Sequence, residues 1–320
     1  MYMKTNPLAQ EPSIIAGGCW EDNGQEIKLG VPKEYSFAEN LRYLSKSPNE
    51  CLFQIKDQKI YRALAIEDET PILEISMEHE RVLTIRFLAG TAPTRQSVRL
   101  EVARYVSEWF DLETDLLPFY ALAQSDVLLQ RAVESFYGLR MIGIPDFFEA
   151  ICWGIIGQQI NLPFAYTLKR RLVESYGRRV HGDGTDYWLF PTPQAIAALS
   201  VHDLAGLQMT TRKSEYLIGV AQLIVAGRLS KELLSGAEEK QAEKMLTSIR
   251  GIGPWTANYV LMRCLHVPSA FPIDDVGLHN AIKYVLGTDQ KPTKEEIRQF
   301  ALPWKNWESY ATFYLWRFLY

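Results

Sequence analysis

The hydrophobic period of the sequence changes near residue 110, and this change limits the folds open to the chain. Before it, short runs at 52–56, 60–66, 71–77 and 81–88 are separated by tight polar breaks, which is typical of antiparallel strands. After it, apolar residues recur at three- and four-residue steps, which is typical of helices. We therefore predict an α+β protein, with an antiparallel β-rich domain over 1–110 and an all-helical domain over 111–320.

Helix ends are marked by the residues that usually begin or end helices. Several segments start with Pro or Asp or stop near Gly, as helices should. We expect helices at 36–44 and 97–109 in the first part. In the second part we expect them at 147–156, 163–176, 193–199, 201–207, 212–226, 238–249, 254–264, 276–286, 293–301 and 307–319.

Composition excludes several classes of protein. The chain of 320 residues is 47% hydrophobic and 22% charged, which is ordinary for a soluble globular protein. It has no apolar run near the ~20 residues of a membrane span, and its first residues lack the pattern of a secretory signal. We expect a cytoplasmic protein, nuclear in a eukaryote, with no membrane partner. The net charge of −4 means that any nucleic-acid binding would use local patches or backbone amides.

The cysteines are few and far apart. Cys19, Cys51, Cys152 and Cys264 form no CxxC pair, which argues against a disulfide framework, a zinc finger or a clustered iron–sulfur site. We expect buried, reduced thiols.

A glycine-rich turn joins two predicted helices within residues 246–264. Gly251 suits a left-handed cap after the first helix, and Pro254 suits the first turn of the second. Backbone N–H groups at the start of the second helix would lie at its positive end, where a phosphate binds well. The same Gly-Ile-Gly tripeptide also suits an ordinary corner between helices.

Two further features lie close to this turn in sequence. Asp274 and Asp275 precede the helix predicted from Val276, where carboxylates serve as caps or as catalytic groups. Trp255 and Tyr259 are four residues apart and share a helix face. Such rings usually belong to a core, but a flipped nucleobase also requires an aromatic slot.

Together these features resemble the helix-hairpin-helix DNA glycosylase superfamily. In that superfamily a GxGxxTA hairpin is followed by an aspartate at the start of a later helix. The branch resembled is the DNA-3-methyladenine glycosylase II type. Further motifs follow in the order of that branch: Phe147-Phe-Glu-Ala with Ile155-Ile-Gly-Gln-Gln, Leu189-Phe-Pro-Thr-Pro-Gln, Arg212-Lys-Ser and Trp304-Lys-Asn-Trp-Glu-Ser-Tyr-Ala. The match is strong over 138–319 and weaker over 1–137.

The resemblance implies a glycosylase that removes alkylated purines in base excision repair. It assigns catalysis to Asp275 rather than Asp274. It also assigns a base pocket to four aromatic residues, the last by a looser match: Trp255, Tyr259, Trp316 and Tyr43. Trp255 stands where lyase-competent relatives have a lysine, and tryptophan cannot form a Schiff base. The resemblance therefore predicts a monofunctional enzyme.

The expected partner is double-stranded DNA with a damaged base, bound by a monomer. The resemblance assigns DNA binding to the hairpin and to a turn that probes the duplex; these residues are Gly251, Ile252, Gly253, Pro254 and Thr256, with Gln159 and Ile160. Either Gln159 or Ile160 would fill the gap left by the flipped nucleotide. Val276 and Arg317 replace two tyrosines of the family's bacterial prototype, which leaves the lesion range open.

No cofactor is required on this interpretation, and the cysteine cluster of the iron–sulfur relatives is absent. The resemblance implies a monovalent cation held by the backbone carbonyls of Thr247, Ile249 and Ile252, which would help to neutralise a phosphate. The basic residues 169–171 and 178–179 form either a solvated face or a phosphate contact.

Two other functions remain open from the sequence. One is a helix-hairpin-helix glycosylase for deaminated or oxidised bases, although Trp255 argues against a lyase of that kind. The other is a non-catalytic helix-hairpin-helix module that only binds DNA. Asp275 and the probing turn argue against it, because a binding module needs neither.

Overall fold

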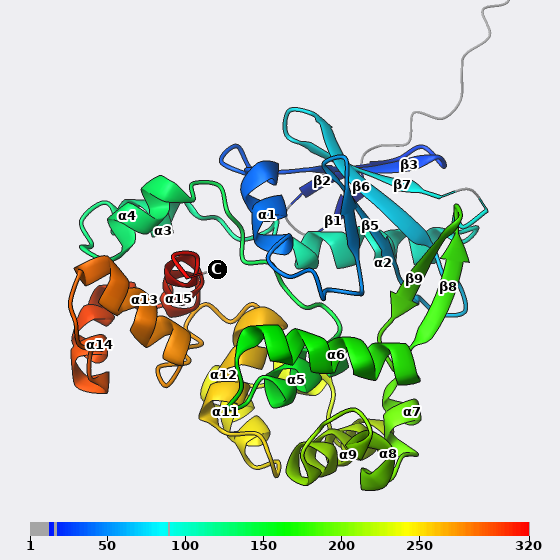
Figure 1. Ribbon diagram of the computed structural model, residues 1–320. Helices are drawn as coiled ribbons and strands as arrows, with labels where there is room; N and C mark the ends of the chain where they lie inside the picture. The colour runs from blue at the N-terminus through cyan, green and yellow to red at the C-terminus, as the bar shows by residue number, and fades with distance from the viewer. Residues whose placement is uncertain (1–12, 16–17, 89, 320) are drawn as a thin grey trace, which may run out of the picture.

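The computed structural model describes residues 13–15, 18–88 and 90–319, and its N-terminal part is built on a sheet (Figure 1). Within the described residues seven strands form this sheet, in the order β1-β2-β3-β7-β6-β5-β4. The strands are β1 (Ser13–Ile15), β2 (Gly18–Asp22), β3 (Glu26–Gly30), β4 (Gln54–Lys56), β5 (Lys59–Ala63), β6 (Ile72–His79) and β7 (Val82–Phe87).

Every pair of neighbouring strands in the sheet is antiparallel, as predicted. The register aligns the fully buried isoleucines Ile27, Ile60, Ile75 and Ile85 across the sheet. The four strands expected from the alternation are confirmed as β4–β7. The sequence analysis missed β1–β3, because these strands are short and polar residues interrupt their apolar pattern.

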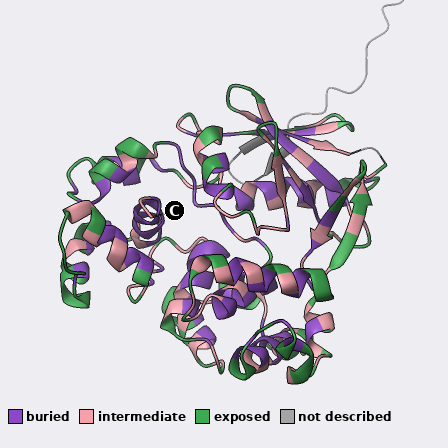
Figure 2. Cartoon of the chain, in the orientation of Figure 1, coloured by how far each residue is buried: buried purple, intermediate pink, exposed green. Residues whose placement is uncertain are grey.

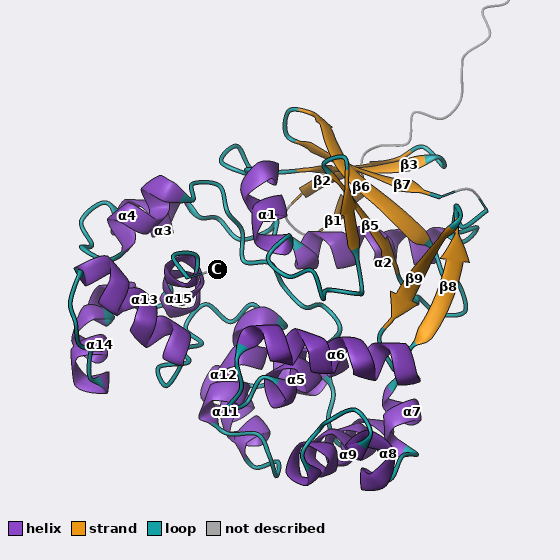
Figure 3. Cartoon of the chain, in the orientation of Figure 1, coloured by secondary structure: helices purple, strands orange, loops and turns teal. Residues whose placement is uncertain are grey.

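Helices fill the remainder of the molecule (Figure 3). The helices are α1 (Phe37–Leu44), α2 (Gln96–Trp109), α3 (Leu117–Ala123), α4 (Leu129–Ser135), α5 (Phe147–Ile156), α6 (Leu162–Tyr176), α7 (Pro193–Ala197), α8 (Val201–Ala205), α9 (Thr211–Val225), α10 (Lys231–Ser235), α11 (Glu239–Thr247), α12 (Pro254–Arg263), α13 (Val276–Leu286), α14 (Lys294–Phe300), the 3₁₀ helix η1 (Leu302–Trp304) and α15 (Glu308–Trp316). Every helix predicted from the periodicity is present. The unpredicted helices α3, α4 and α10 span seven residues or fewer.

The prediction of an all-helical second part is wrong at one hairpin. Strands β8 (Arg178–Gly182) and β9 (Thr185–Leu189) pair antiparallel there. Asp183 and Gly184 form the turn with φ of 50° and 68°, a geometry that matches the twist of a two-residue hairpin. The Asp-Gly pair was the signal that the periodicity analysis overlooked.

Buried residues of the sheet and of the helices belong to one continuous core, and Figure 2 shows buried residues in both parts of the chain. A continuous core does not mark a domain boundary, so the boundary near residue 110 stays a prediction. Cys152 and Cys264 are buried and Cys51 is half-buried, all three as free thiols; the side chain of Cys19 lies outside the described residues. Among the helices described, none is long and apolar enough to span a bilayer.

Candidate active site

The glycine-rich turn joins α11 to α12 as a tight hairpin. Gly251 has a φ of +95°, and a Cβ there would lie 2.2 Å from the ring of Tyr216. Both the backbone conformation and the lack of space therefore exclude a side chain at this position. Gly253 caps α12, and Pro254 occupies its first turn. The proline position and the positive φ of Gly251 are confirmed, but Gly251 is not the cap of the first helix, because α11 already ends at Thr247 with Ser248 as a right-handed C-cap. Helix α12 therefore begins at the hairpin, where the first N–H groups of a helix have no partner within the helix.

Asp275 is the N-cap of α13, and its carboxylate is held by three N–H donors. Oδ1 accepts from the backbone N–H of Leu278 at 2.7 Å and from the indole Nε1 of Trp316 at 2.8 Å. Oδ2 accepts from the indole Nε1 of Trp255 at 2.7 Å. Donors from α12, α13 and α15 thus fix both oxygens in place.

The neighbouring carboxylate has a different environment. Asp274 is exposed and forms an ion pair with Lys294 on α14. Exposed pairs of this kind contribute about 0–1 kcal/mol. The geometry separates the two carboxylates, because only that of Asp275 is oriented by aromatic side chains.

A glycine next to the carboxylate makes this arrangement possible. A Cβ at Gly277 would lie 2.8 Å from Oδ1 of Asp275 and 3.3 Å from Nε1 of Trp316. A larger residue would push the indole and the carboxylate apart. This glycine, two residues after Asp275, is a sequence signal that the analysis missed.

The four aromatic residues predicted for the base pocket lie in one cluster. The Trp255 and Tyr259 rings stack with centroids 5.5 Å apart, and Tyr259 stacks with Trp316 at 6.3 Å. Tyr43, from α1, joins through Phe313, whose ring is 4.7 Å from that of Tyr43 and 6.4 Å from that of Trp316. The structure thus brings together residues that lie up to 273 positions apart, from Tyr43 to Trp316 (316 − 43 = 273).

Two cationic side chains that the sequence analysis missed lie against this cluster. Arg263 donates from Nη1 to the Tyr259 hydroxyl at 3.0 Å and from Nε to the carbonyl of Ile142 at 2.7 Å. The Lys46 ammonium lies 3.8 Å from the centroid of the Tyr43 ring. Arg263 follows Tyr259 by one helical turn, so helical spacing was an available signal for it, whereas Lys46 lies beyond the end of α1 at Leu44.

The charges affect the two tyrosines differently. Burial raises the pKa of Tyr259 above its ordinary value, and the nearby charge of Arg263 only partly offsets this. Burial also acts to raise the pKa of Tyr43, but the charges of Arg263, Lys46 and Arg317 outweigh it and lower that pKa. The Tyr43 side of the cluster is therefore electropositive.

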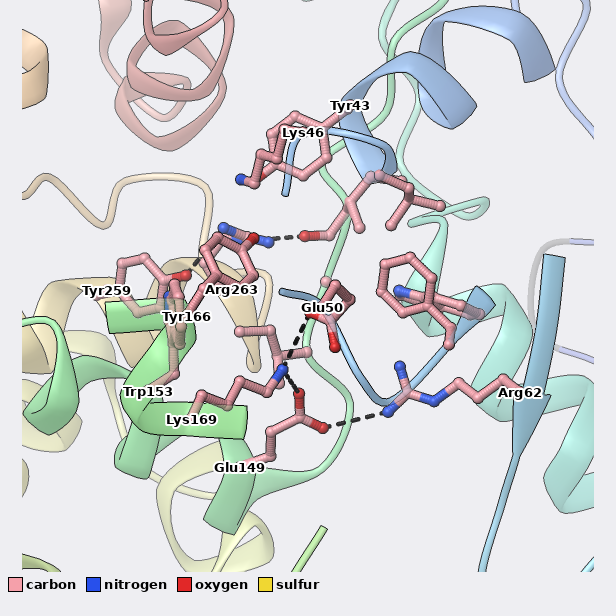
Figure 4. Close-up of a pocket in the computed structure, with 16 residues that line it drawn as sticks. Tyr43, Lys46, Glu50, Arg62, Glu149, Trp153, Tyr166, Lys169, Tyr259 and Arg263 are labelled. Atoms are coloured by element: carbon pink, nitrogen blue, oxygen red, sulfur yellow. Dashed lines mark hydrogen bonds and ion pairs between the residues drawn. The ribbon is translucent and has the colours of Figure 1, made fainter. Parts of the chain in front are cut away.

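A cavity extends from Tyr43, Lys46, Tyr259 and Arg263 toward a buried ion network (Figure 4). In this network the Glu149 carboxylate accepts from Nζ of Lys169 at 2.9 Å and from Nη2 of Arg62 at 3.2 Å, and Glu50 lies 3.3 Å from the same Lys169 Nζ. The network links α5 and α6 to strand β5 and to the segment after α1.

The expectation of a solvated or phosphate-binding Lys169 is wrong. Its side chain is buried, and the two carboxylates compensate its charge. A buried ammonium requires such partners. The adjacent Arg170 is exposed and pairs with Glu174 along the helix.

The probing turn after α5 is tied to the hairpin. Gln158 donates from Nε2 to the carbonyl of Gly251 at 2.8 Å and to Oγ1 of Thr256 at 3.0 Å. Gln159 is exposed and has a φ of +56°, whereas Ile160 is half-buried against the core. The turn and the hairpin therefore form one rigid surface with Gln159 at its outside.

The side chains of Ile252 and Thr256 are buried, so only the backbone of these residues is available to a ligand. The carbonyl of Ile249 accepts from the N–H of Ile252 at 3.0 Å, and Thr247 is the last residue of α11. Carbonyl oxygens are ligands that a hard cation prefers, and the cation expected on these three residues stays a prediction.

Comparisons with known proteins agree with this geometry. Residues 152–306 match the family model described as HhH-GPD superfamily base excision DNA repair protein, and residues 52–151 match that of the 8-oxoguanine DNA glycosylase N-terminal domain. A DNA-3-methyladenine glycosylase of Bacillus subtilis is 49% identical over 94% of this chain and 99% of its own. The chain belongs to the HhH-GPD superfamily.

Other HhH-GPD proteins extend the similarity. DNA-3-methyladenine glycosylase 2 of Escherichia coli is 30% identical over 88% of this chain and 93% of its own. The structure of a 3-methyladenine DNA glycosylase from Archaeoglobus fulgidus superposes with a TM-score of 0.78, at 24% identity, covering 91% of this chain and 97% of that one. The α+β arrangement of a sheet followed by a helical core is thus the fold of this HhH-GPD group.

Proposed function

We propose that this HhH-GPD protein is a DNA glycosylase that hydrolyses the N-glycosidic bond of alkylated purines of the 3-methyladenine type. The observation that carries the proposal is the Asp275 carboxylate, held by the indoles of Trp255 and Trp316 beside an aromatic cluster. The printed names of the two relatives, both DNA-3-methyladenine glycosylases, support it.

Binding begins on the DNA backbone. The N–H groups at the start of α12 hold a phosphate of the lesion strand, which requires no lysine. Gln159, exposed on its left-handed turn, fills the stack that the flipped nucleotide leaves. Unstacking costs a few kcal/mol, less for a weakly paired damaged base.

The tryptophan rings attract the damaged base. An alkylated purine carries positive charge, and the face of an indole attracts such a cation by about 0.5–2 kcal/mol. Trp255 and Trp316 also direct their N–H groups at Asp275, so the same two residues bind the base and orient the carboxylate.

Bond cleavage places positive charge on the sugar. As the C1′–N bond breaks, its electron pair leaves with the base, and the sugar becomes an oxocarbenium ion. The Asp275 carboxylate stabilises this ion in a site of low dielectric constant. Water then adds to C1′, and Asp275 accepts its proton. A cationic base leaves neutral, so it requires no strong acid.

The enzyme leaves the abasic strand uncut on this proposal. A Schiff base requires an amine at the sugar, and the hairpin position that carries it in lyase-type relatives is Trp255, whose indole is bound to Asp275. The protein acts as a monomer on duplex DNA, in the cytoplasm where the nucleoid lies, without a required cofactor or an iron–sulfur cluster. A monovalent cation on the carbonyls of Thr247, Ile249 and Ile252 supports the phosphate contact.

The test is base release under single turnover, from duplexes with one N7-methylguanine, hypoxanthine or 8-oxoguanine. We expect release of the alkylated purine, with strand breaks only after alkali and no adduct trapped by borohydride. A trapped adduct would overturn the monofunctional assignment alone. Normal DNA binding without release of any base would overturn the glycosylase and favour a non-catalytic binding module.

A further inference from the structure

The aromatic cluster carries opposite charges at its two ends. At one end, the Asp275 carboxylate is held by Trp255 and Trp316. At the other end, Lys46 and Arg263 lie against Tyr43, and both line the cavity next to Tyr259. The stacked ring of Tyr259 connects the two ends. A base that stacked along this cluster with its sugar beside Asp275 would direct its far edge to the Lys46 end.

We propose that Lys46 stabilises the negative charge that develops on an uncharged departing base, and so determines which lesions the enzyme releases. The lesion class it serves is an uncharged base with hydrogen-bond acceptors, a carbonyl oxygen or ring nitrogen, on the edge away from the sugar. This inference rests on the proposed glycosylase function and concerns the leaving group rather than the sugar.

The chemistry of the two lesion classes differs at the base. In both, the C1′–N bond breaks and its electron pair moves to the base nitrogen. A cationic base becomes neutral, whereas an uncharged base becomes an anion. Water supplies the hydroxyl at C1′ and loses its proton to Asp275, and the base anion takes a proton from the Lys46 ammonium, which solvent water then restores. A positive donor at the far edge is therefore useful only for the uncharged class.

Among the cations of the cavity, Lys46 is the one placed to do this. Nε and Nη1 of Arg263 donate to the carbonyl of Ile142 and to the hydroxyl of Tyr259. Lys169 is held by Glu149 and Glu50, and Arg62 by Glu149. The Lys46 ammonium is half-buried on the face of Tyr43. Its flexible stem and three rotatable donors let it turn from the ring to a base edge.

The surroundings of Lys46 also favour proton donation. Burial and the neighbouring charges of Arg263 and Arg317 lower the pKa of Lys46, and Tyr43 opposes them only partly. A lower pKa brings the ammonium closer to the acidity that proton transfer to a departing base needs. The same positive charge repels a base that is already cationic.

The experiment compares two lesions in the same variants, under single turnover with the enzyme in excess. Lys46→Met keeps the length of the side chain and removes the charge, and Lys46→Arg keeps the charge. Lys56→Met makes the same change at an exposed lysine at the end of β4. The probes are duplexes with hypoxanthine, which is uncharged and has a carbonyl oxygen, or with N7-methylguanine, which is cationic.

In Lys46→Met we expect hypoxanthine release to slow about 10-fold, the effect of losing one charged hydrogen bond, while N7-methylguanine release becomes faster. The ratio of the two rates thus changes by more than about 10-fold. Lys46→Arg, which keeps the charge but cannot give up its proton, restores only part of it, and Lys56→Met leaves it unchanged. An equal loss on both lesions, an unchanged ratio, or a wild type that releases N7-methylguanine but no hypoxanthine would overturn the role of Lys46. A wild type that releases neither base would overturn the proposed function, and this inference with it.

Discussion

The two ends of the aromatic cluster are built in different ways. The Asp275 end is made by α12, α13 and α15, and N–H donors from these helices fix its carboxylate. The Lys46 end combines α1, α5, α6, α12 and strand β5, and a buried ion network supports it. The first end is specified by neighbouring residues and a few aromatic side chains. The second depends on contacts between the sheet and the helices.

The largest effect on stability should come from breaking the ion network. Glu149→Gln leaves Lys169 and Arg62 buried with one negative partner fewer, which costs about 3 kcal/mol in the free energy of unfolding. Urea denaturation measures this. Burial acts to raise the pKa of Glu149, but Lys169 and Arg62 lower it overall. The stabilisation by Glu149 is therefore full at neutral pH and lost as the pH falls through the lowered pKa, so the difference between wild type and variant shrinks in acid.

A matched variant tests whether the loss of stability requires a buried ion pair or follows from loss of any carboxylate charge. Glu174→Gln removes the exposed partner of Arg170 on α6, and exposed pairs contribute only about 0–1 kcal/mol. We expect its unfolding curve to stay close to that of wild type. Equal destabilisation by both variants would mean that the network does not hold the Lys46 end in place.

The second prediction concerns the Asp275 end. Trp316→Phe keeps an aromatic ring but removes the indole N–H that binds Oδ1 of Asp275. Base release at saturating enzyme should slow about 10-fold on both lesions, the loss expected for one hydrogen bond to a carboxylate, because saturation removes the effect of the weaker ring on binding of the cationic base. Single-turnover rates on both duplexes measure it.

The control for this variant removes a similar bond elsewhere. The indole of Trp304 donates to Oδ2 of Asp126 at 2.7 Å in the core. Trp304→Phe should lower the melting temperature with little change in the release rate of the folded enzyme. If Trp316→Phe affected one lesion class only, the division of roles between the two ends would be wrong.

The smallest effect is expected at the link between the probing turn and the hairpin. Gln158→Ala removes the donor to the carbonyl of Gly251 and to Thr256. The turn and the hairpin then no longer move as one, and affinity for duplex DNA should fall by about 3- to 5-fold, as for a neutral hydrogen bond. Release at saturating enzyme should change little. Gln130→Ala, on the exposed face of α4, is the control and should bind DNA as wild type does.

Sequence reasoning succeeded where local rules determine the structure. The hairpin with Gly251 and Pro254, the cap at Asp275 and the helices follow from short-range patterns, and the structure has them. The resemblance also predicted Tyr43 as part of the cluster, and its ring lies against Phe313.

Long-range contacts were not predictable in this way. Nothing in the sequence near Lys169 shows that Glu50 lies beside it, because 119 positions separate them. The same holds for Lys46 and Arg263, which meet over Tyr43 only once α1 packs against α12 and α15. The β8–β9 hairpin was missed for a local reason, its short Asp-Gly turn, which helix periodicity does not detect.

The most direct test of the account is the single-turnover rate of Asp275→Asn on N7-methylguanine and hypoxanthine duplexes. Asparagine keeps the size of the side chain and removes the charge opposite the sugar cation. The account predicts a loss of at least about 10³-fold on both lesions, about 4 kcal/mol, with DNA affinity close to wild type. A variant that retained release within about 10-fold of wild type would contradict the assignment of Asp275 as the catalytic carboxylate.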